Sequence, residues 1–118
     1  MRGRQPYCPD SYDIVWIDFD PQAGREQAGR RPAYVLSPRR YNALTGLCIL
    51  CPMTNQAKGY PFEVEMPKGH KVGGVILADH VKSLSWKARR SEFMAKCPEV
   101  AEEVVGKIDA LLPRSGGS

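Results

Sequence analysis

The chain has 118 residues, a formal net charge of +4 at pH 7 and a sequence pI of about 9.0. This length suits one domain with one core, and its 42% hydrophobic and 25% charged residues are ordinary for a globular protein. It contains no apolar run as long as a membrane span, and its basic start is not followed by the apolar segment of a signal peptide. We therefore expect a single cytoplasmic domain, whose positive charge favours an acidic or phosphate-rich partner.

The hydrophobic pattern predicts several short strands separated by polar turns. The first strand is apolar on both faces and is therefore expected to be central and buried. The second begins at Pro32, where a missing N–H does least harm. We interpret residues 38–46 as a polar crossover. The predicted strands cover residues 13–20, 32–37, 47–53, 62–66, 74–78 and about 91–95.

One helix is expected, at residues 98–112. Pro98 suits its first position, and three glutamates lie near the positive end of the helix dipole. The apolar stripe of this helix consists of Val100, Val104, Ile108, Leu111 and Leu112. Short strands with one terminal helix and no β–α alternation predict a mainly β fold, a small β-barrel with the helix packed on it. We expect a core at about 12–112, a loose arm at 1–11 and a disordered tail at 113–118.

Four cysteines raise the question of a metal site. Cys48 and Cys51 lie three positions apart in a predicted strand, so their side chains are expected on opposite faces and cannot share a metal. Cys8 and Cys97 are isolated in the sequence. We therefore expect free thiols, with no metal and no cofactor.

A polar loop between the first two strands is the strongest candidate for a functional site. Residues 18–32 read DFDPQAGREQAGRRP. The loop carries a carboxylate, an amide and three arginines: Glu26, Gln27, Arg25, Arg30 and Arg31. A loop so rich in functional groups and held at both ends by strands is a typical place for a site.

Four stretches of the sequence resemble, in the same order, the MazF/PemK (Kid) family of toxin endoribonucleases. They read DIVWIDFDPQAGREQAGRRPAYVLS, CPMTNQAKGYPFEV, GGVILADHVKSL and KIDALL, and together they span nearly the whole chain. Two positions that the Kid branch fills with histidine and arginine hold Arg25 and Leu77 here. The resemblance is therefore closer to the MazF branch.

The resemblance implies a homodimeric SH3-like barrel of the CcdB/PemK type that cleaves single-stranded RNA, mostly mRNA, at short sequences without a metal. It implies a cognate MazE-like antitoxin whose C-terminal segment covers the RNA site. It also assigns catalysis to Arg31 and Thr54. Trp16 and Trp86 are expected in the core or in a dimer contact.

Cleavage of RNA without a metal usually proceeds by attack of the 2′-hydroxyl on the adjacent phosphate, which leaves a 2′,3′-cyclic phosphate and a 5′-hydroxyl. Arg31 offers a permanent planar cation for the phosphate oxygens, and we expect it to stabilise charge rather than act as a base. Thr54 either hydrogen-bonds the phosphate or caps a turn. Glu26 is a candidate general base or orients Arg31, unless it is a plain surface acid. His80 either donates a proton or is solvated.

Recognition of single-stranded RNA needs amides, planar surfaces and cations. Amides are supplied by Gln27, Asn55 and Gln56, cations by Lys58 and Lys82, and Tyr60 offers a stacking surface. The expected substrate-binding residues are Arg25, Gln27, Asn55, Gln56, Lys58, Asp79, His80 and Lys82. Two other functions remain open from the sequence: a CcdB-like toxin that inhibits DNA gyrase, and a barrel that binds RNA without cutting it.

Overall fold

The computed structural model describes residues 6–19 and 29–115, whose strands form one seven-stranded antiparallel sheet. Its hydrogen-bonded order is β4-β5-β3-β2-β1-β7, and β6 also pairs with β3. The strands are β1 (Asp13–Asp18), β2 (Arg30–Val35), β3 (Leu47–Thr54), β4 (Glu63–Glu65), β5 (Val75–Leu77), β6 (Lys82–Ser85) and β7 (Glu92–Lys96). The described helices are α2 (Arg39–Thr45), the 3-10 turn η1 (Pro98–Val100) and α3 (Ala101–Ala110). The predicted mainly β fold with a C-terminal helix is confirmed, although the sheet is not closed into a complete barrel.

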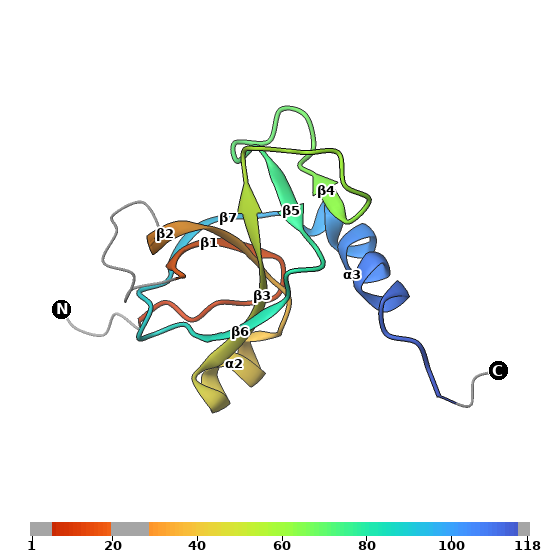
Figure 1. Cartoon of the computed structure of the whole chain (residues 1–118). Helices are drawn as coiled ribbons and strands as arrows, with labels where there is room; N and C mark the ends of the chain where they lie inside the picture. The colour runs from red at the N-terminus through yellow and green to blue at the C-terminus, as the bar shows by residue number, and fades with distance from the viewer. Residues whose placement is uncertain (1–5, 20–28, 116–118) are drawn as a thin grey trace.

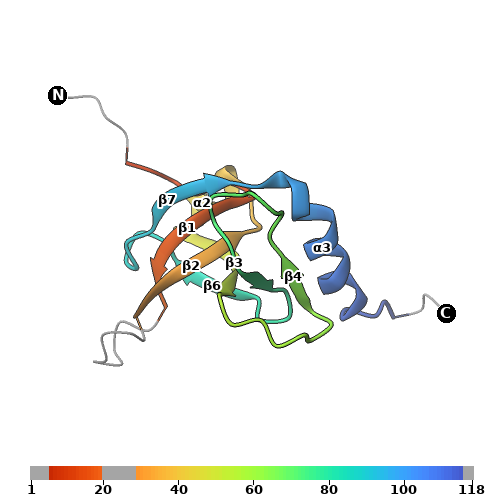
Figure 2. The same cartoon turned by 90° about the horizontal axis from the view of Figure 1, so that it is seen from above.

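The longest strand, β3, organises the sheet (Figure 1). On one side it pairs with β2, and on the other it pairs first with β6 and then with β5. Pro52 lies where the second partner changes, between the pairs of Leu50 with Lys82 and Met53 with Ile76. A proline is tolerated there because no ladder hydrogen bond needs its missing N–H. Figure 2 shows β7, β1 and β2 side by side, with α3 at one end of the molecule.

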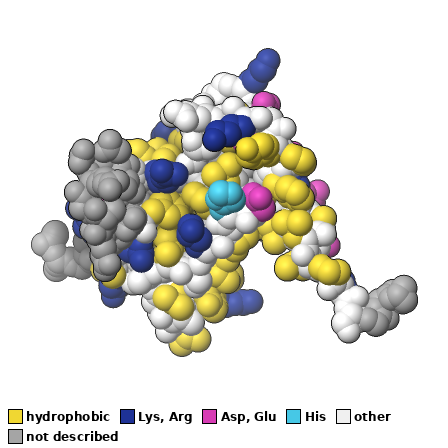
Figure 3. All heavy atoms as spheres, viewed as in Figure 1, with side chains coloured by type: hydrophobic (Ala, Val, Ile, Leu, Met, Phe, Trp, Pro, Cys, Tyr) yellow, Lys and Arg dark blue, Asp and Glu magenta, His cyan; other side chains and the backbone are white. Residues whose placement is uncertain are grey.

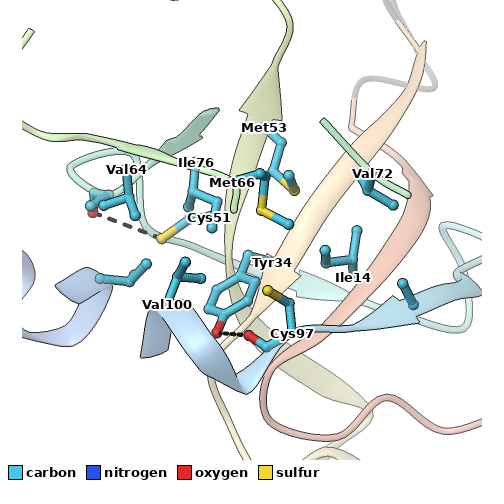
Figure 4. Packing of buried hydrophobic residues seen from close by; sticks show 13 residues of the cluster. Ile14, Tyr34, Cys51, Met53, Val64, Met66, Val72, Ile76, Cys97 and Val100 are labelled. Carbon is cyan, nitrogen blue, oxygen red and sulfur yellow. Dashed lines mark hydrogen bonds between the residues drawn. The ribbon is translucent and has the colours of Figure 1, made fainter. Parts of the chain in front are cut away.

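The two faces of the sheet carry separate apolar clusters. The first contains Ile14, Tyr34, Cys51 and Met53 and is completed by β4, β5 and α3; Figure 4 shows it around Tyr34, whose hydroxyl donates to the Cys97 carbonyl at 2.7 Å. The second cluster contains Val15, Ile17, Ala33, Val35, Cys48, Leu50 and Trp86. Cys48 and Cys51 therefore lie on opposite faces, as predicted. Burial raises the pKa of both thiols to about 12, which keeps them protonated.

The crossover expected at residues 38–46 is wrong, because it contains α2. This helix buries no apolar stripe; its buried residue is Asn42. The Asn42 side-chain amide donates to the carbonyls of Pro9 and Ser37 at 2.8 and 3.0 Å, and the Asn42 backbone carbonyl accepts the Trp86 indole N–H at 2.8 Å. Polar anchors thus replace the hydrophobic periodicity by which a helix is recognised in a sequence.

Two further details differ from the sequence analysis. Strand β6 was not predicted, because Lys82–Ser85 is short and mostly polar and is paired only with β3. Leu111 and Leu112 do not complete the buried stripe; α3 ends at Ala110, and they are 44% and 62% exposed. Of the two tryptophans, Trp86 is in the core and Trp16 is 38% exposed, so the dimer contact is the alternative that stays open for Trp16.

The segment expected as a loose arm is described from Pro6 onward, and there it is hydrogen-bonded to the rest of the protein. The Tyr7 hydroxyl donates to the Asp13 carboxylate at 2.5 Å, and the Ser11 hydroxyl donates to the Leu36 carbonyl at 2.9 Å. Within residues 6–19 and 29–115, neither α3 nor a shorter helix has the length and apolarity needed to cross a membrane.

Candidate active site

Strands β2 and β3 bring Arg31 and Thr54 together. Their antiparallel register pairs Ala33 with Pro52, and continuing it by two residues places Arg31 opposite Thr54. Side chains directly opposite one another in an antiparallel pair lie on the same face of the sheet. Two residues that are distant in the sequence therefore meet on one face of the sheet, where β2 begins and β3 ends.

Both residues line a groove of about 300 Å³, called here the Arg31–Thr54 groove. Its other walls come from the segment after β3, the start of β4 and the end of β5. The lining residues are Arg31, Thr54, Gln56, Lys58, Tyr60, Glu63, Leu77, Asp79 and His80. A second hollow adjoins it and adds Arg30, Pro32, Met53 and Asn55 to the shared residues Arg31, Thr54 and Gln56.

The Arg31 side chain is exposed and makes no hydrogen bond or ion pair with any other residue in the described parts of the chain. Its neighbour Arg30, in contrast, forms ion pairs with Asp18 and Glu92. A guanidinium with unused donors at the mouth of a groove is suited to bind phosphate oxygens in a bidentate manner.

Thr54 ends β3 and its hydroxyl accepts the backbone N–H of Gln56 at 3.1 Å. This is the turn-capping contact that the sequence left open as an alternative. The hydroxyl proton is not used in this bond, so Thr54 can cap the turn and still donate a hydrogen bond into the groove.

Gly74 supports Thr54 from behind. Its φ is +95°, and a Cβ atom on it would lie 2.5 Å from the Thr54 carbonyl oxygen and 2.9 Å from the Asn55 amide oxygen. Only glycine permits this close approach of two backbones. The position of Thr54 is therefore fixed both by β3 and by the loop before β5.

Asp79 and His80 follow β5 and form the opposite wall of the groove. The His80 Nε2 lies 3.7 Å from the Asp79 Oδ1, which is an ion pair when the imidazole is protonated. Both side chains are about half exposed, at 54% and 45%. Figure 3 shows Lys and Arg side chains spread over the sheet side of this face, whereas most acidic side chains lie toward α3.

Most of the predicted site residues that are described gather here. Arg31, Thr54, Gln56, Lys58, Asp79 and His80 line the groove, and Asn55 lines the adjoining hollow. Lys82 is exposed on β6 and does not line either of them. Arg25, Glu26 and Gln27 lie outside the described residues. Among those described, no three His, Cys, Asp or Glu side chains cluster as a metal site would.

Glu63 lines the groove but was not predicted as a site residue. The sequence analysis placed it only within the strand predicted at residues 62–66. Its hydrogen-bond partners are the backbone N–H groups of Lys58 and Gly59, which no side-chain pattern in the sequence marks.

The fold and the groove define a class: a small, mainly β protein with a groove whose Arg31 and Lys58 are suited to a phosphate-bearing ligand. Comparison with known proteins gives the family. Residues 10–115 match the PemK-like, MazF-like toxins of type II toxin-antitoxin systems. The chain belongs to this family, and the resemblance seen in the sequence is confirmed.

Individual relatives agree. The chain is 50% identical over 107 residues to the endoribonuclease toxin MazF of Escherichia coli K12, covering 90% of this chain and 96% of that protein. It is 32% identical over 104 residues to the endoribonuclease PemK of Escherichia coli, covering 83% and 78%. A crystal structure of MazF from Deinococcus radiodurans matches with a TM-score of 0.82 and 56% identity, covering 91% of this chain and 98% of that one. A MazE–MazF complex from the same organism matches with a TM-score of 0.81 and 50% identity, covering 93% and 100%.

Proposed function

We propose that this chain is a toxin endoribonuclease that cleaves single-stranded RNA, chiefly mRNA, at a short sequence in the cytoplasm and is neutralised by a cognate MazE-like antitoxin. Its relatives MazF and PemK are endoribonucleases by name, and MazF of Deinococcus radiodurans has been crystallised with MazE. The observation that carries the proposal is the meeting of Arg31 and Thr54 in one groove.

The proposed reaction is metal-independent. The 2′-oxygen attacks the phosphorus, the bond to the 5′-oxygen breaks, and the products carry a 2′,3′-cyclic phosphate and a 5′-hydroxyl. Arg31 neutralises charge on the non-bridging oxygens as the phosphate becomes more negative, and Thr54 donates a hydrogen bond to the same group. One proton must leave the 2′-hydroxyl and one must reach the 5′-oxygen. We assign Glu26 as the candidate base and His80 as a candidate proton donor.

RNA binding in this proposal uses the rest of the groove. Lys58 contacts a backbone phosphate, Tyr60 stacks on a base, and the amides of Asn55 and Gln56 read base edges. Tyr60 is 62% exposed, so its ring is accessible for stacking. Asp79 in the groove wall and Lys82 on β6 are further proposed RNA contacts, and Arg25 and Gln27 are kept as RNA contacts on the strength of the sequence.

We further propose that the active form is a homodimer. Trp16 lies on β1, next to the edge strand β7, and is 38% exposed. Large aromatic side chains at a surface are typical of protein contacts. Light scattering of the purified protein would measure its mass in solution.

The deciding experiment is digestion of a long bacterial transcript by the purified protein in excess EDTA, followed by mapping of the new 5′ ends. Fragments that begin at one short sequence and carry 5′-hydroxyls are expected. A requirement for added magnesium would overturn the proposed chemistry. RNA that is bound but left intact would indicate a non-catalytic barrel, and inhibition of gyrase supercoiling without RNA cleavage would indicate a CcdB-like toxin.

A further inference from the structure

The segment between β3 and β4 forms one wall of the Arg31–Thr54 groove. The shape of this segment depends on Gly59 and Glu63, neither of which is proposed to act on the phosphate. Gln56, Lys58 and Tyr60 of this segment line the groove. The chain reverses at Gly59, which has a φ of +80°. This left-handed conformation turns the N–H groups of two successive residues, Lys58 and Gly59, toward the same side.

Those two N–H groups converge on the Glu63 carboxylate. Lys58 N–H donates to both oxygens, at 3.1 Å to Oε1 and 2.9 Å to Oε2, and Gly59 N–H donates to Oε1 at 3.0 Å. The Glu63 N–H in turn donates to the Tyr60 carbonyl at 3.1 Å. The carboxylate thus occupies an anion-binding concavity of the backbone and ties the segment to the start of β4.

A carboxylate that lines a groove for a polyanion needs an explanation, because like charges repel. Glu63 forms no ion pair with a Lys, Arg or His side chain among the described residues; its hydrogen bonds there come from backbone N–H groups. Its negative charge therefore serves to bind the backbone N–H groups of Lys58 and Gly59. Charge-assisted hydrogen bonds of this kind are stronger than those to a neutral amide.

We propose that Glu63 is a positioning residue for RNA binding: it fixes the 55–60 segment so that Gln56 and Lys58 face the substrate. This inference rests on the proposed function. Thr54 is held independently, by β3 and by the contact with Gly74. Loss of the Glu63 carboxylate should therefore weaken binding of RNA while leaving the chemical step nearly unchanged.

The test compares Glu63→Gln with Glu65→Gln. Both changes remove one negative charge from β4, but Glu65 is exposed and does not line the groove. The probe is a short RNA that spans the mapped cut site, together with a copy carrying a 2′-deoxy group at the cut position for binding measurements. For Glu63→Gln we expect a rise of about tenfold in KM and in the Kd of the uncleavable RNA, with kcat nearly unchanged. Glu65→Gln should behave as wild type or bind slightly more tightly.

The sign of the effect separates positioning from simple electrostatics. If Glu63 only contributed negative charge, its removal would lower the KM, and that result would overturn the inference. A fall in kcat with KM unchanged would overturn it as well. Hydrogen exchange of the Lys58 and Gly59 amides, measured by NMR in the free proteins, should be faster in Glu63→Gln. Unchanged exchange rates would contradict the proposal that the Glu63 carboxylate fixes this segment. If the wild type neither binds nor cuts RNA, the proposed function fails first and this inference fails with it.

Discussion

Arg30 and Arg31 are neighbours in β2, yet their surroundings differ completely. Arg30 Nη1 donates to the Asp18 carboxylate at 2.9 Å, and its Nη2 donates to Glu92 Oε1 and to the Arg90 carbonyl, both at 2.8 Å. Arg31 has no such partner within the described residues and lines the groove. Successive residues of a strand point to opposite faces, so one arginine holds the sheet edge and the next remains available for a ligand.

Arg30 belongs to a hydrogen-bond network at the end of β1, centred on Asp18. The Asp18 carboxylate also accepts the Arg90 Nε at 2.9 Å, while Arg89 donates to the backbone carbonyls of Asp18 and Phe19. The hydrogen bond from Arg90 is the largest of the effects that lower the pKa of Asp18, and the bond from Arg30 adds to it. This network fixes the end of β1 and the start of β2, so its role is structural.

Replacing Arg31 should have the largest effect. Arg31→Ala is expected to lower kcat/KM by about 100-fold or more, because a preorganised cation no longer meets the charge that develops on the phosphate. Its melting temperature should remain that of wild type, since Arg31 has no hydrogen-bond partner in the described structure. Arg31→Lys keeps the charge and loses the fork, and should recover only part of the rate. Cleavage of the mapped RNA by Arg31→Ala at the wild-type rate would contradict the assigned role.

Replacing Thr54, which lines the same groove as Arg31, should have a smaller effect on cleavage. Thr54→Ala should lower kcat/KM by about tenfold or more, because it removes a hydrogen-bond donor to the phosphate. Thr54→Ser retains the hydroxyl and should remain close to wild type. Single-turnover cleavage of the mapped RNA measures both. Equal losses in the two variants would indicate that packing of the methyl group matters and the hydroxyl does not.

Replacing Gly74 should lower both stability and cleavage, and the same change at Gly73 serves as the matched control. Gly74→Ala places a Cβ against the Thr54 carbonyl in a strained backbone, and should cost about 1–3 kcal/mol in the free energy of unfolding and lower cleavage several-fold. A Cβ on Gly73 meets no atom within 4 Å, so Gly73→Ala should be nearly neutral. Urea denaturation and the cleavage assay, applied to both variants, check this. Equal behaviour would show that the close backbone contact does not hold Thr54.

Replacing Arg30 is expected to lower stability and leave cleavage nearly unchanged, the opposite of replacing Arg31. Arg30→Ala should lower the free energy of unfolding by about 1–3 kcal/mol, because a largely buried carboxylate loses a charged partner. Cleavage per folded molecule should stay near the wild-type value. Urea unfolding and active-site titration measure the two quantities separately. Loss of cleavage without loss of stability would place Arg30 in the reacting group and end the distinction between the two arginines.

The smallest effect is a pH dependence from Asp18. Because its folded-state pKa is lowered, the stabilisation is fully present above the ordinary aspartate pKa of about 3.9 and is lost as the pH falls through the lowered value. Wild type should therefore lose stability below about pH 4 more steeply than Asp18→Asn, which should be less stable at neutral pH. Thermal melts between neutral and acidic pH measure both curves. Parallel curves would show that Asp18 does not titrate with folding.

The sequence predicted the strands that carry apolar residues, because these follow from periodicity, and the family motifs singled out Arg31 and Thr54, which the structure places in one groove. The family resemblance singles out Arg31, but the residue pattern alone places both arginines in the loop. It does not show that Arg30 is structural, because the extension of β2 back to Arg30 depends on its pairing with Asp18. It also missed α2, which Asn42 anchors through polar contacts formed only in the folded protein. Glu63 was missed for the same reason: its partners are backbone atoms, whose positions no residue pattern records.

The two tryptophans offer a built-in optical probe of the molecule. Trp86 is 7% exposed, with its indole N–H bonded to the Asn42 carbonyl, whereas Trp16 is 38% exposed on β1. The emission of the buried indole should shift to longer wavelength only when the second apolar cluster and α2 come apart. The emission of the surface indole should respond to whatever covers the β1–β7 edge while the protein stays folded. With Trp16→Phe and Trp86→Phe, fluorescence can therefore report unfolding and surface association as two distinct signals from one chain.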